Sequence, residues 1–274
     1  MSRYIVAVSG GVDSVVLLDK LTKVPEHEYV VAHFDHGIRS DSAEDALFVE
    51  ALARNYGLPF ETRREELGVE ASEELARERR YVFLREMADK HSARIVTAHH
   101  ADDAIETLAI NLKRGTGWRG LAALDSPDIS RPLLRAHKSE LHDYALKQRL
   151  EWREDSTNAS DVYLRNRLRR LVSAVPHIEK RQLLILREQQ LLCRQLIDKE
   201  VTRLVGPGPH YSRYFFTHVP KVVAMECLRF VTDARLTRPQ LERALLAIKT
   251  AHKGHAYEAG AGITLRFTTR NFSL

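Results

Sequence analysis

The sequence contains very little cysteine. Cys193 and Cys227 are the only two cysteines among its 274 residues, and they lie far apart. A disulfide framework or a zinc motif needs paired or clustered cysteines, so the sequence indicates neither. Because each cysteine falls within a helical pattern, we expect both side chains to be packed. This cysteine content fits a reducing, cytoplasmic environment best.

Long apolar runs are also absent. No stretch approaches the roughly 20 residues that span a bilayer. The N-terminus lacks a signal-peptide pattern, because charged residues return by Asp13. We therefore expect no membrane partner, and a chain of this length holds one large domain or two modest ones.

Charge is unevenly distributed along the chain. Residues 1–130 carry 16 basic and 23 acidic side chains, residues 131–213 carry 17 and 10, and residues 214–274 carry 9 and 4. The net charge of +5 thus hides an acidic first half and a basic second half. An acidic half suits cations or an ammonium-bearing substrate, and a basic half suits a polyanion. Chance is the alternative, and we favour nucleic-acid binding over it.

Strand-like runs alternate with helical patterns through the first half of the chain. We expect strands at residues 4–8, 29–34, 59–62 and 94–98, with helices after the first strand to Leu21 and over 42–57, 72–91 and 102–113. This alternation predicts the α/β class, with a doubly wound, mostly parallel sheet. Ligands of such sheets bind beyond the carboxyl ends of the strands.

The second half of the chain becomes helical and basic from Arg135. We expect helices at residues 137–149, 177–203, 219–232 and 238–251, followed by strands at 256–259 and 263–268. The segment Gly206-Pro207-Gly208-Pro209 predicts a linker. The expected organisation is a nucleotide-binding and catalytic domain at 1–175, a connecting helix at 176–205, the linker at 206–209, and a small α+β domain at 210–274.

The most informative segment is Ser9-Gly10-Gly11-Val12-Asp13-Ser14, between the first predicted strand and its helix. The glycines allow a tight turn, and the helix start offers N–H donors to an anion. Asp13 would repel a bare phosphate but suits a divalent cation that bridges phosphates. The segment is neither a Walker loop nor a dinucleotide fingerprint. An ordinary strand–helix turn is the alternative, and we favour a phosphate loop.

Two more polar clusters follow predicted strands. In residues 33–39, Asp35 is placed to accept hydrogen bonds from a nucleotide base or ribose, although each residue taken alone is more often a structural polar group. In residues 97–107, Asp103 and Glu106 share one helix face. Acidic residues in a first helical turn also suit the helix dipole. We expect this carboxylate pair to hold an ammonium group or a metal ion.

The phosphate loop resembles that of the ATP pyrophosphatase superfamily. Four further motifs follow it in order: HFDHGIRSDSAED at 33–45, TAHHADDAIETLAINLKRGTGWRGLAAL at 97–124, RPLL at 131–134 and EDSTNASDVYLRNRLR at 154–169. Together they resemble the tRNA(Ile)-lysidine synthetase family from the N-terminus to about residue 170, and the last motif distinguishes that family. The segment after the linker resembles the family's small second domain only loosely.

This resemblance implies an adenine-nucleotide alpha-hydrolase-like fold and a ligase. ATP, with Mg²⁺, would adenylate the C2 oxygen of the wobble cytidine in the CAU anticodon of isoleucine tRNA. Free L-lysine would then attack C2 and expel AMP, which gives lysidine. The implied partners are the tRNA and free lysine, and the domain at 210–274 would contact the tRNA.

The resemblance also implies roles for particular residues. The ATP site would comprise Ser9, Gly10, Gly11, Val12, Asp13 and Ser14, with Asp13 also holding magnesium. The catalytic and substrate-binding set would comprise Asp35, His36, Asp103, Glu106 and Arg114, with residues 113–117 cradling phosphates. The tRNA would be contacted by Arg119, Arg165, Asn166 and Arg169, although a basic stretch is by default a solvated helix face.

Two alternatives stay open. A tRNA cytidine thiolase of the same superfamily would normally need reactive cysteines, which are scarce here. A non-catalytic ATP- and RNA-binding protein is opposed by the intact Asp13, Asp103 and Glu106. Longer family members carry a further C-terminal domain, whereas this sequence ends at Leu274. We therefore expect a short form, and we hypothesise that it works as a homodimer.

Overall fold

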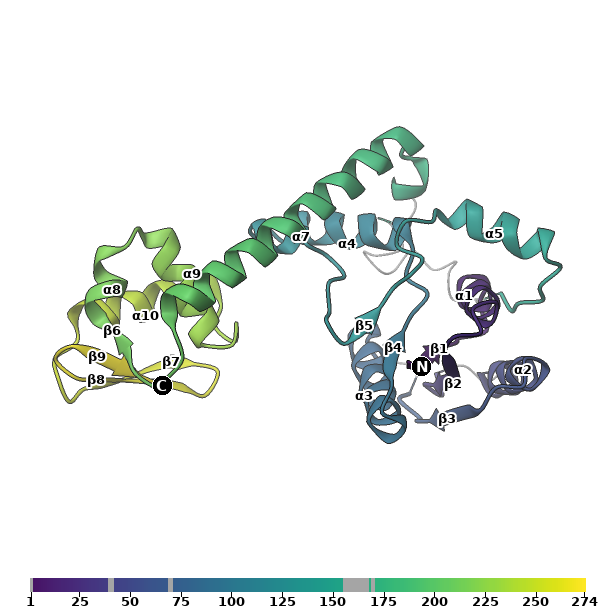
Figure 1. The fold of residues 1–274 in the computed structure, drawn as a ribbon, viewed down its shortest axis with the longest axis horizontal. Coiled ribbons are helices and arrows are strands. Elements are labelled where there is room, and N and C mark those ends of the chain that lie inside the picture. Colours follow the sequence, from purple (N-terminus) through teal and green to yellow (C-terminus); the bar gives the residue numbers. More distant parts are fainter. Residues whose placement is uncertain (1, 39–41, 69–70, 155–167, 169–170) are drawn as a thin grey trace. The chain divides into compact units, whose positions relative to one another are not determined.

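The computed structural model describes residues 2–38, 42–68, 71–154, 168 and 171–274 (Figure 1). The chain divides into two compact units, Met1–Gln190 and Leu191–Leu274, and the boundary falls within the long helix α7 (His177–Val205). The domain limits expected from the sequence stay a prediction. In the described part of the chain, no helix is both long and apolar enough to cross a membrane.

The first unit is built on a five-stranded sheet in the order β3-β2-β1-β4-β5. Every pairing in it is parallel, which confirms the predicted α/β class. Its strands are β1 (Arg3–Ala7), β2 (Glu28–Asp35), β3 (Phe60–Arg64), β4 (Arg94–Val96) and β5 (Ile129–Ser130). The sequence did not predict β5, because two residues are too few to show a strand period.

Helices cover both faces of this sheet (Figure 1). They are α1 (Val12–Thr22), α2 (Ser42–Asn55), α3 (Glu73–His91), α4 (Ala101–Lys113) and α5 (Lys138–Lys147), with the short 3₁₀ helix η1 (Trp118–Leu121) after α4. Successive residues of β1 point to opposite faces. Val6 therefore packs in a core with residues of α1, α2 and α5, and Ile5 packs in a second core with residues of α3.

The sheet order reverses at one place. From β1 the chain moves outward through β2 and β3, and it then returns to add β4 and β5 on the other side. The carboxyl ends of β1 and β4 are thus the topological switch point, where ligands of such folds bind. The loop at residues 9–14 follows β1, and the cluster at residues 97–107 follows β4. The fold therefore brings together two segments that are far apart in the sequence.

The second unit is a small α+β unit with an antiparallel sheet in the order β6-β9-β8-β7, as predicted in class. Its elements after α7 are β6 (Tyr211–Ser212), α8 (Arg213–His218), α9 (Lys221–Val231), α10 (Arg238–Thr250), β7 (Ala256–Gly260), β8 (Ile263–Phe267) and β9 (Asn271–Ser273). Phe216, Leu228 and Phe272 lie in its core. The sequence did not predict β6, α8 or β9, which are short.

The two cysteines behave differently. Cys227 on α9 is buried, and burial raises the pKa of its thiol to about 11. Cys193 on α7 is exposed, so the prediction that it is packed is wrong. Apolar residues lie on more than one side of α7, where Ile178 and Leu192 are also exposed, and the sequence could not show which side is covered.

Candidate active site

The loop between β1 and α1 is shaped by its glycines and serines. Gly10 has a φ of +91°, a conformation that other residues rarely adopt. The Ser14 hydroxyl donates to the Gly11 carbonyl at 2.8 Å and accepts from the Ser9 N–H at 3.2 Å. The loop thus folds around Ser14 and leads directly into α1, whose first N–H groups have no earlier carbonyl to bond. This geometry fits an anion.

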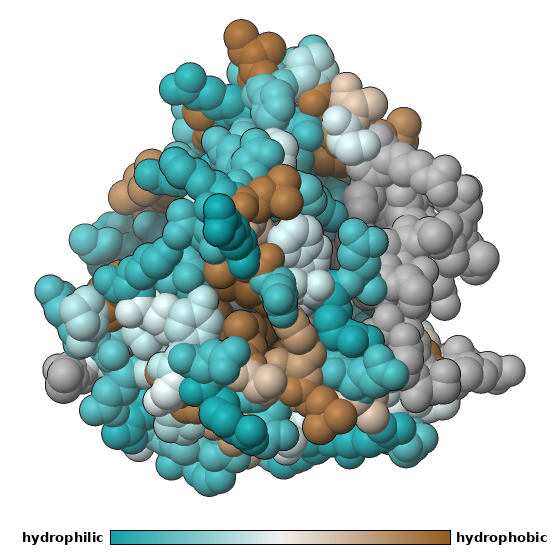
Figure 2. All heavy atoms as spheres, turned by 90° about the vertical axis from the view of Figure 1, so that its right-hand side faces the viewer, coloured by the Kyte–Doolittle hydropathy of each residue, from teal (hydrophilic) through white to brown (hydrophobic). Residues whose placement is uncertain are grey.

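The segment after α5 supports the same loop. The Arg153 N–H donates to the Gly10 carbonyl at 3.0 Å, and its guanidinium pairs with Glu44 at 2.9 Å and with Asp45. An open pocket of about 460 Å³ lies here, lined by Phe48, Leu150, Glu151, Trp152 and Arg153. Figure 2 views the side of the first unit that carries α1, α2 and α5, where apolar areas lie between larger hydrophilic ones. The sequence did not indicate this pocket.

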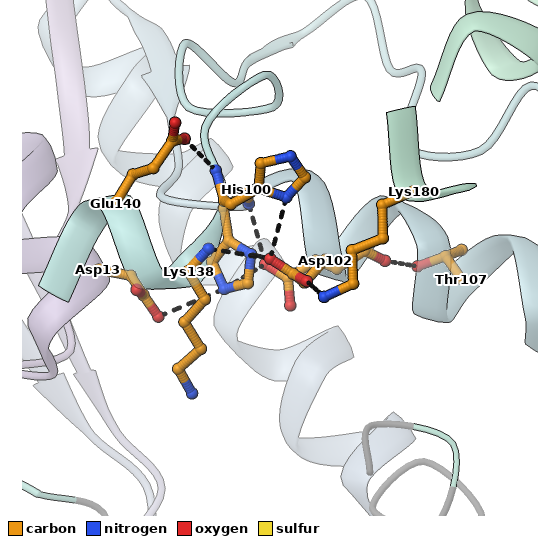
Figure 3. Close-up of polar contacts among 9 residues, drawn as sticks. Asp13, His100, Asp102, Thr107, Lys138, Glu140 and Lys180 are labelled. Carbon is orange, nitrogen blue, oxygen red and sulfur yellow. Dashed lines mark hydrogen bonds and ion pairs between the residues drawn. The ribbon is translucent and has the colours of Figure 1, made fainter. Parts of the chain in front are cut away.

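His100 lies among three carboxylates (Figure 3). Its Nε2 is 3.6 Å from Asp13 Oδ2 and 3.5 Å from Asp103 Oδ2, and its Nδ1 is 3.8 Å from Asp102 Oδ2. Burial alone would lower the pKa of His100, but the contact with Asp13 and the charges of Asp103 and Asp102 outweigh it and raise the pKa above its usual value. His100 therefore joins the loop after β1 to the cluster after β4.

Asp13 has one oxygen without a partner. Its Oδ1 is enclosed, and no hydrogen bond to it exists among the described residues. In the described part of the chain, no three or more His, Cys, Asp or Glu side chains are arranged so that they could hold a metal ion by themselves. A magnesium ion here would take one protein carboxylate and complete its shell with phosphates and water, which is how Mg²⁺ usually binds beside nucleotides. Asp13 fits that role.

Asp103 and Glu106 lie one turn apart on α4, as predicted. The Asp103 carboxylate accepts the His100 N–H at 3.0 Å and so caps the helix, and the Asp103 carbonyl accepts the Thr107 hydroxyl at 2.8 Å. Glu106 is only 2% exposed. A buried carboxylate beside a partly accessible one is a suitable site for a cation.

His99 is held neutral beside this pair. Burial lowers the pKa of His99 to about 3; the Asp103 charge opposes this, and the charges of Arg77, Arg131 and Arg80 add to it. Its Nδ1 is 2.8 Å from the Thr97 hydroxyl. The pKa values of the two adjacent histidines are therefore shifted in opposite directions.

Asp35 and His36 occupy the end of β2. Asp35 Oδ1 accepts the Gly37 N–H at 2.9 Å, and Oδ2 lies 3.2 Å from Arg64 Nη1. The Asp35 carboxylate thus closes the turn after β2 and is nearly inaccessible. The His36 ring packs edge-on against Phe34 at 5.6 Å. The role expected for both in substrate binding stays a prediction.

Two of the expected basic residues, Arg114 and Arg119, lie in described segments. Arg114 is exposed at the C-terminal end of α4, about 16 Å along the helix from Asp103. Arg119 lies on η1 with its guanidinium 4.7 Å from the Trp118 ring centroid. The three remaining predicted tRNA contacts, Arg165, Asn166 and Arg169, lie outside the described residues.

Sequence reasoning missed an ion pair beside the site. Asp102 Oδ1 accepts from Lys180 Nζ on α7 at 2.7 Å, and Oδ2 accepts the Lys138 N–H at the start of α5 at 2.9 Å (Figure 3). Burial raises the pKa of Asp102, but these two hydrogen bonds and the Lys180 charge outweigh it and lower the pKa below its usual value. Asp102 thus joins three helices beside Asp103.

The sequence is similar to that of known proteins. Residues 1–175 match the family model of the PP-loop domain. A tRNA(Ile)-lysidine synthase from Exiguobacterium sibiricum is 43% identical over 172 residues, which cover 60% of this chain and 41% of that protein. A tRNA(Ile)-lysidine synthase from Thermus thermophilus is 34% identical over 280 residues, which cover 96% of this chain and 54% of that protein. A third, from Thermotoga maritima, is 32% identical over 269 residues, which cover 90% of this chain and 65% of that protein.

A solved structure supports the fold. A U34-tRNA thiolase from Methanococcus maripaludis superposes with a TM-score of 0.60 over 70% of this chain and 72% of that one, at 15% identity. That likeness concerns the fold alone. The chain spans between 41% and 65% of the length of the three synthases named above.

Proposed function

From the premise that the chain belongs to the PP-loop domain family, we propose that it ligates free L-lysine to the wobble cytidine of isoleucine tRNA. The reaction would use ATP, attach lysine at C2 of the cytidine in a CAU anticodon, and yield lysidine, AMP and pyrophosphate. The observation that carries the proposal is the meeting of Asp13 and Asp103 around His100 at the switch point of the sheet.

The loop after β1 serves the ATP half of the reaction. The N–H groups at the start of α1 and the Ser9 and Ser14 hydroxyls would hold phosphate oxygens. Asp13 would hold Mg²⁺, which when bound neutralises charge that develops on the leaving pyrophosphate. The cytidine O2 would attack the α-phosphate, and the bond from the α-phosphate to pyrophosphate would break. The fixed donors of the loop need no reorganisation at that moment.

The cluster after β4 serves the lysine half. Asp103 and Glu106 would bind the lysine as an ammonium cation, and a carboxylate of this pair would take a proton from the ε-ammonium group, which leaves the free amine to attack C2. The C2–O bond to AMP would then break. The neighbouring Asp102 pairs with the ammonium of Lys180, which is the kind of contact proposed here for the substrate lysine.

The basic second half of the sequence would bind the tRNA. Residues 131–213 and 214–274 carry 26 basic against 14 acidic side chains. Phosphate contacts from them would supply much of the affinity and make it salt-dependent. Single-stranded anticodon bases can be splayed into a protein pocket, and the pocket beside Trp152 is next to the loop.

A tRNA cytidine thiolase remains the second candidate, since the solved thiolase shares the fold. That thiolase carries a [4Fe-4S] cluster. Such clusters are held by several cysteine thiolates. This sequence has two cysteines, and Cys227 is enclosed in the core of the second unit. The lysine ligase is therefore favoured.

The test is transfer of radiolabelled lysine. The chain is incubated with ATP, Mg²⁺, labelled lysine and an isoleucine tRNA transcript bearing CAU, and label in tRNA is counted beside AMP and pyrophosphate release. We expect equal amounts of the three. A transcript with uridine at the wobble position is the control and should stay unlabelled. No label under conditions where ATP still binds would contradict the proposal.

A further inference from the structure

A cavity of about 260 Å³ lies in the first unit, formed by the segment after β5 and by α7. We call it the arginine pocket; it is lined chiefly by Arg131, Leu134, Arg135, Leu184, Arg187 and Glu188. None of these residues belongs to the loop after β1 or to the cluster after β4. The pocket therefore needs its own explanation.

Arg187 is a buried cation whose partners are neutral. Only 6% of it is exposed, and its Nε donates to the Ala123 carbonyl at 2.7 Å while Nη2 lies 3.5 Å from the Leu124 carbonyl. Its Nη1 has no hydrogen-bond partner among the described residues. A buried charge whose hydrogen-bond partners are all neutral is costly, so the free N–H group of this guanidinium is suited to an anionic acceptor.

Arg131 brings a second positive charge to the same place. Its Nη1 donates to the Leu124 carbonyl at 3.0 Å, so both guanidiniums approach one oxygen. Its Nε is enclosed and has no hydrogen-bond partner among the described residues. Burial lowers the pKa of Arg187; the nearby charges of Asp125 and Glu188 oppose this, and the Arg131 charge adds a smaller lowering. The fold holds two like charges together.

The remaining charges of the pocket largely neutralise one another. Arg135 Nε lies 3.1 Å from Glu188 Oε1, and both side chains are exposed to solvent. Arg131 and Arg187 are the other two charged residues that line the cavity, and Asp125 is a nearby acidic group that only partly offsets the burial of Arg187. Guanidiniums bind phosphate through paired N–H donors, and one phosphate group can accept from both.

We propose that the arginine pocket binds a phosphate group through Arg131 and Arg187. A phosphate there offsets the repulsion between the two guanidiniums and gives Arg187 Nη1 an acceptor. The source is a phosphodiester of the RNA, which rests on the proposed function, or free phosphate or pyrophosphate. The chemistry is the same, and the experiment separates the sources.

The experiment uses the whole chain and the variant Arg187→Met, with Arg181→Gln as the matched control. Arg181 lies on the same helix, is exposed, and does not line the pocket. Arg131→Gln is the second pocket variant, in case Arg187→Met fails to fold. Binding of inorganic phosphate and of pyrophosphate is measured by calorimetry at constant ionic strength. Binding of an anticodon stem-loop RNA is measured over a series of salt concentrations.

For an RNA source we expect both pocket variants to lose about 10-fold in RNA affinity at low salt and about one unit of the slope of log K against log salt, while Arg181→Gln changes less. For a free source, the pocket variants lose one phosphate or pyrophosphate site, the site proposed at the loop after β1 stays, and RNA binding is unchanged. Either result supports a phosphate site. Unchanged binding of all three ligands, or an equal effect of Arg181→Gln, overturns it. None of these readouts depends on lysine transfer, so failure here leaves the proposed function standing.

Discussion

Lys180 on α7 and Asp102 on α4 form an ion pair at 2.7 Å in which both side chains are nearly inaccessible. The pair fixes the first turn of α4, and the next residue is Asp103, which is proposed to bind the substrate lysine. The geometry of the candidate lysine site therefore depends on a helix that is 78 residues away in the sequence.

Lys180→Met should destabilise the chain. It leaves the Asp102 carboxylate enclosed without its cation, which costs about 3–5 kcal/mol in the free energy of unfolding. Urea unfolding measures this change. Lys199→Met, at an exposed position of the same helix, is the control and should change little. The double variant Lys180→Met with Asp102→Asn should recover part of the loss, and no recovery would mean that the two charges are not coupled.

Asp103→Asn should separate the two half-reactions. The amide keeps an oxygen that can cap α4 through the His100 N–H, but it cannot bind an ammonium as strongly or accept a proton. We expect lysine transfer to fall by about 10²–10⁴-fold while pyrophosphate release continues. Measuring AMP, pyrophosphate and labelled tRNA in one reaction shows this. Equal loss of both steps would place Asp103 in the ATP or metal site.

Asp13→Asn should act on the ATP step. The variant weakens the only carboxylate oxygen in the loop that is available to a magnesium ion. Pyrophosphate release should fall by about 100-fold or more, and the magnesium concentration needed for half-maximal rate should rise. A magnesium titration of the wild type and the variant measures both quantities. An unchanged magnesium requirement would exclude Asp13 as a metal ligand.

Gly10→Ala should weaken ATP binding beyond its effect on stability. A left-handed conformation costs a non-glycine residue about 1–2 kcal/mol, and the added Cβ would lie 3.4 Å from Phe48 Cδ1. Gly57 also has a positive φ, of +66°, and an added Cβ there meets no atom within 4 Å. Gly57→Ala thus carries the same backbone cost away from the loop. Calorimetry should show reduced ATP affinity for Gly10→Ala but not for Gly57→Ala. Equal ATP affinities of the two variants would mean that the loop does not bind ATP.

The chain should lose stability in acid through Asp19. Burial raises the pKa of this carboxyl, but hydrogen bonds from Lys23, Tyr144 and Tyr56 outweigh it and lower the pKa below its ordinary value of 3.8. The stability it contributes is therefore fully present above the unfolded-state pKa and is lost as the pH falls through the lower folded-state pKa. Asp19→Asn should flatten the decline in unfolding free energy below about pH 4. If the unfolding free energy of the variant declines as steeply as that of the wild type, other carboxyl groups cause the loss of stability.

The sequence predicted the features that depend on neighbours along the chain. The apolar runs of β1 and β2 and the one-turn spacing of Asp103 and Glu106 are local patterns, and the structure has them. Contacts between distant residues leave no such pattern. In the sequence, Lys180 and Arg187 look like solvated side chains of a charged helix, and no local pattern indicates that they are buried. Short elements such as β5 take their conformation from the strand beside them.

Cys193 is an accessible thiol that can be labelled selectively. Thiol reagents reach only accessible cysteines, and Cys227 is both enclosed and held as a thiol by its raised pKa. A maleimide dye should therefore label Cys193 alone, without any engineered substitution. Because that position is on α7, the dye would report on the helix that the two compact units share, and its fluorescence could follow RNA binding directly.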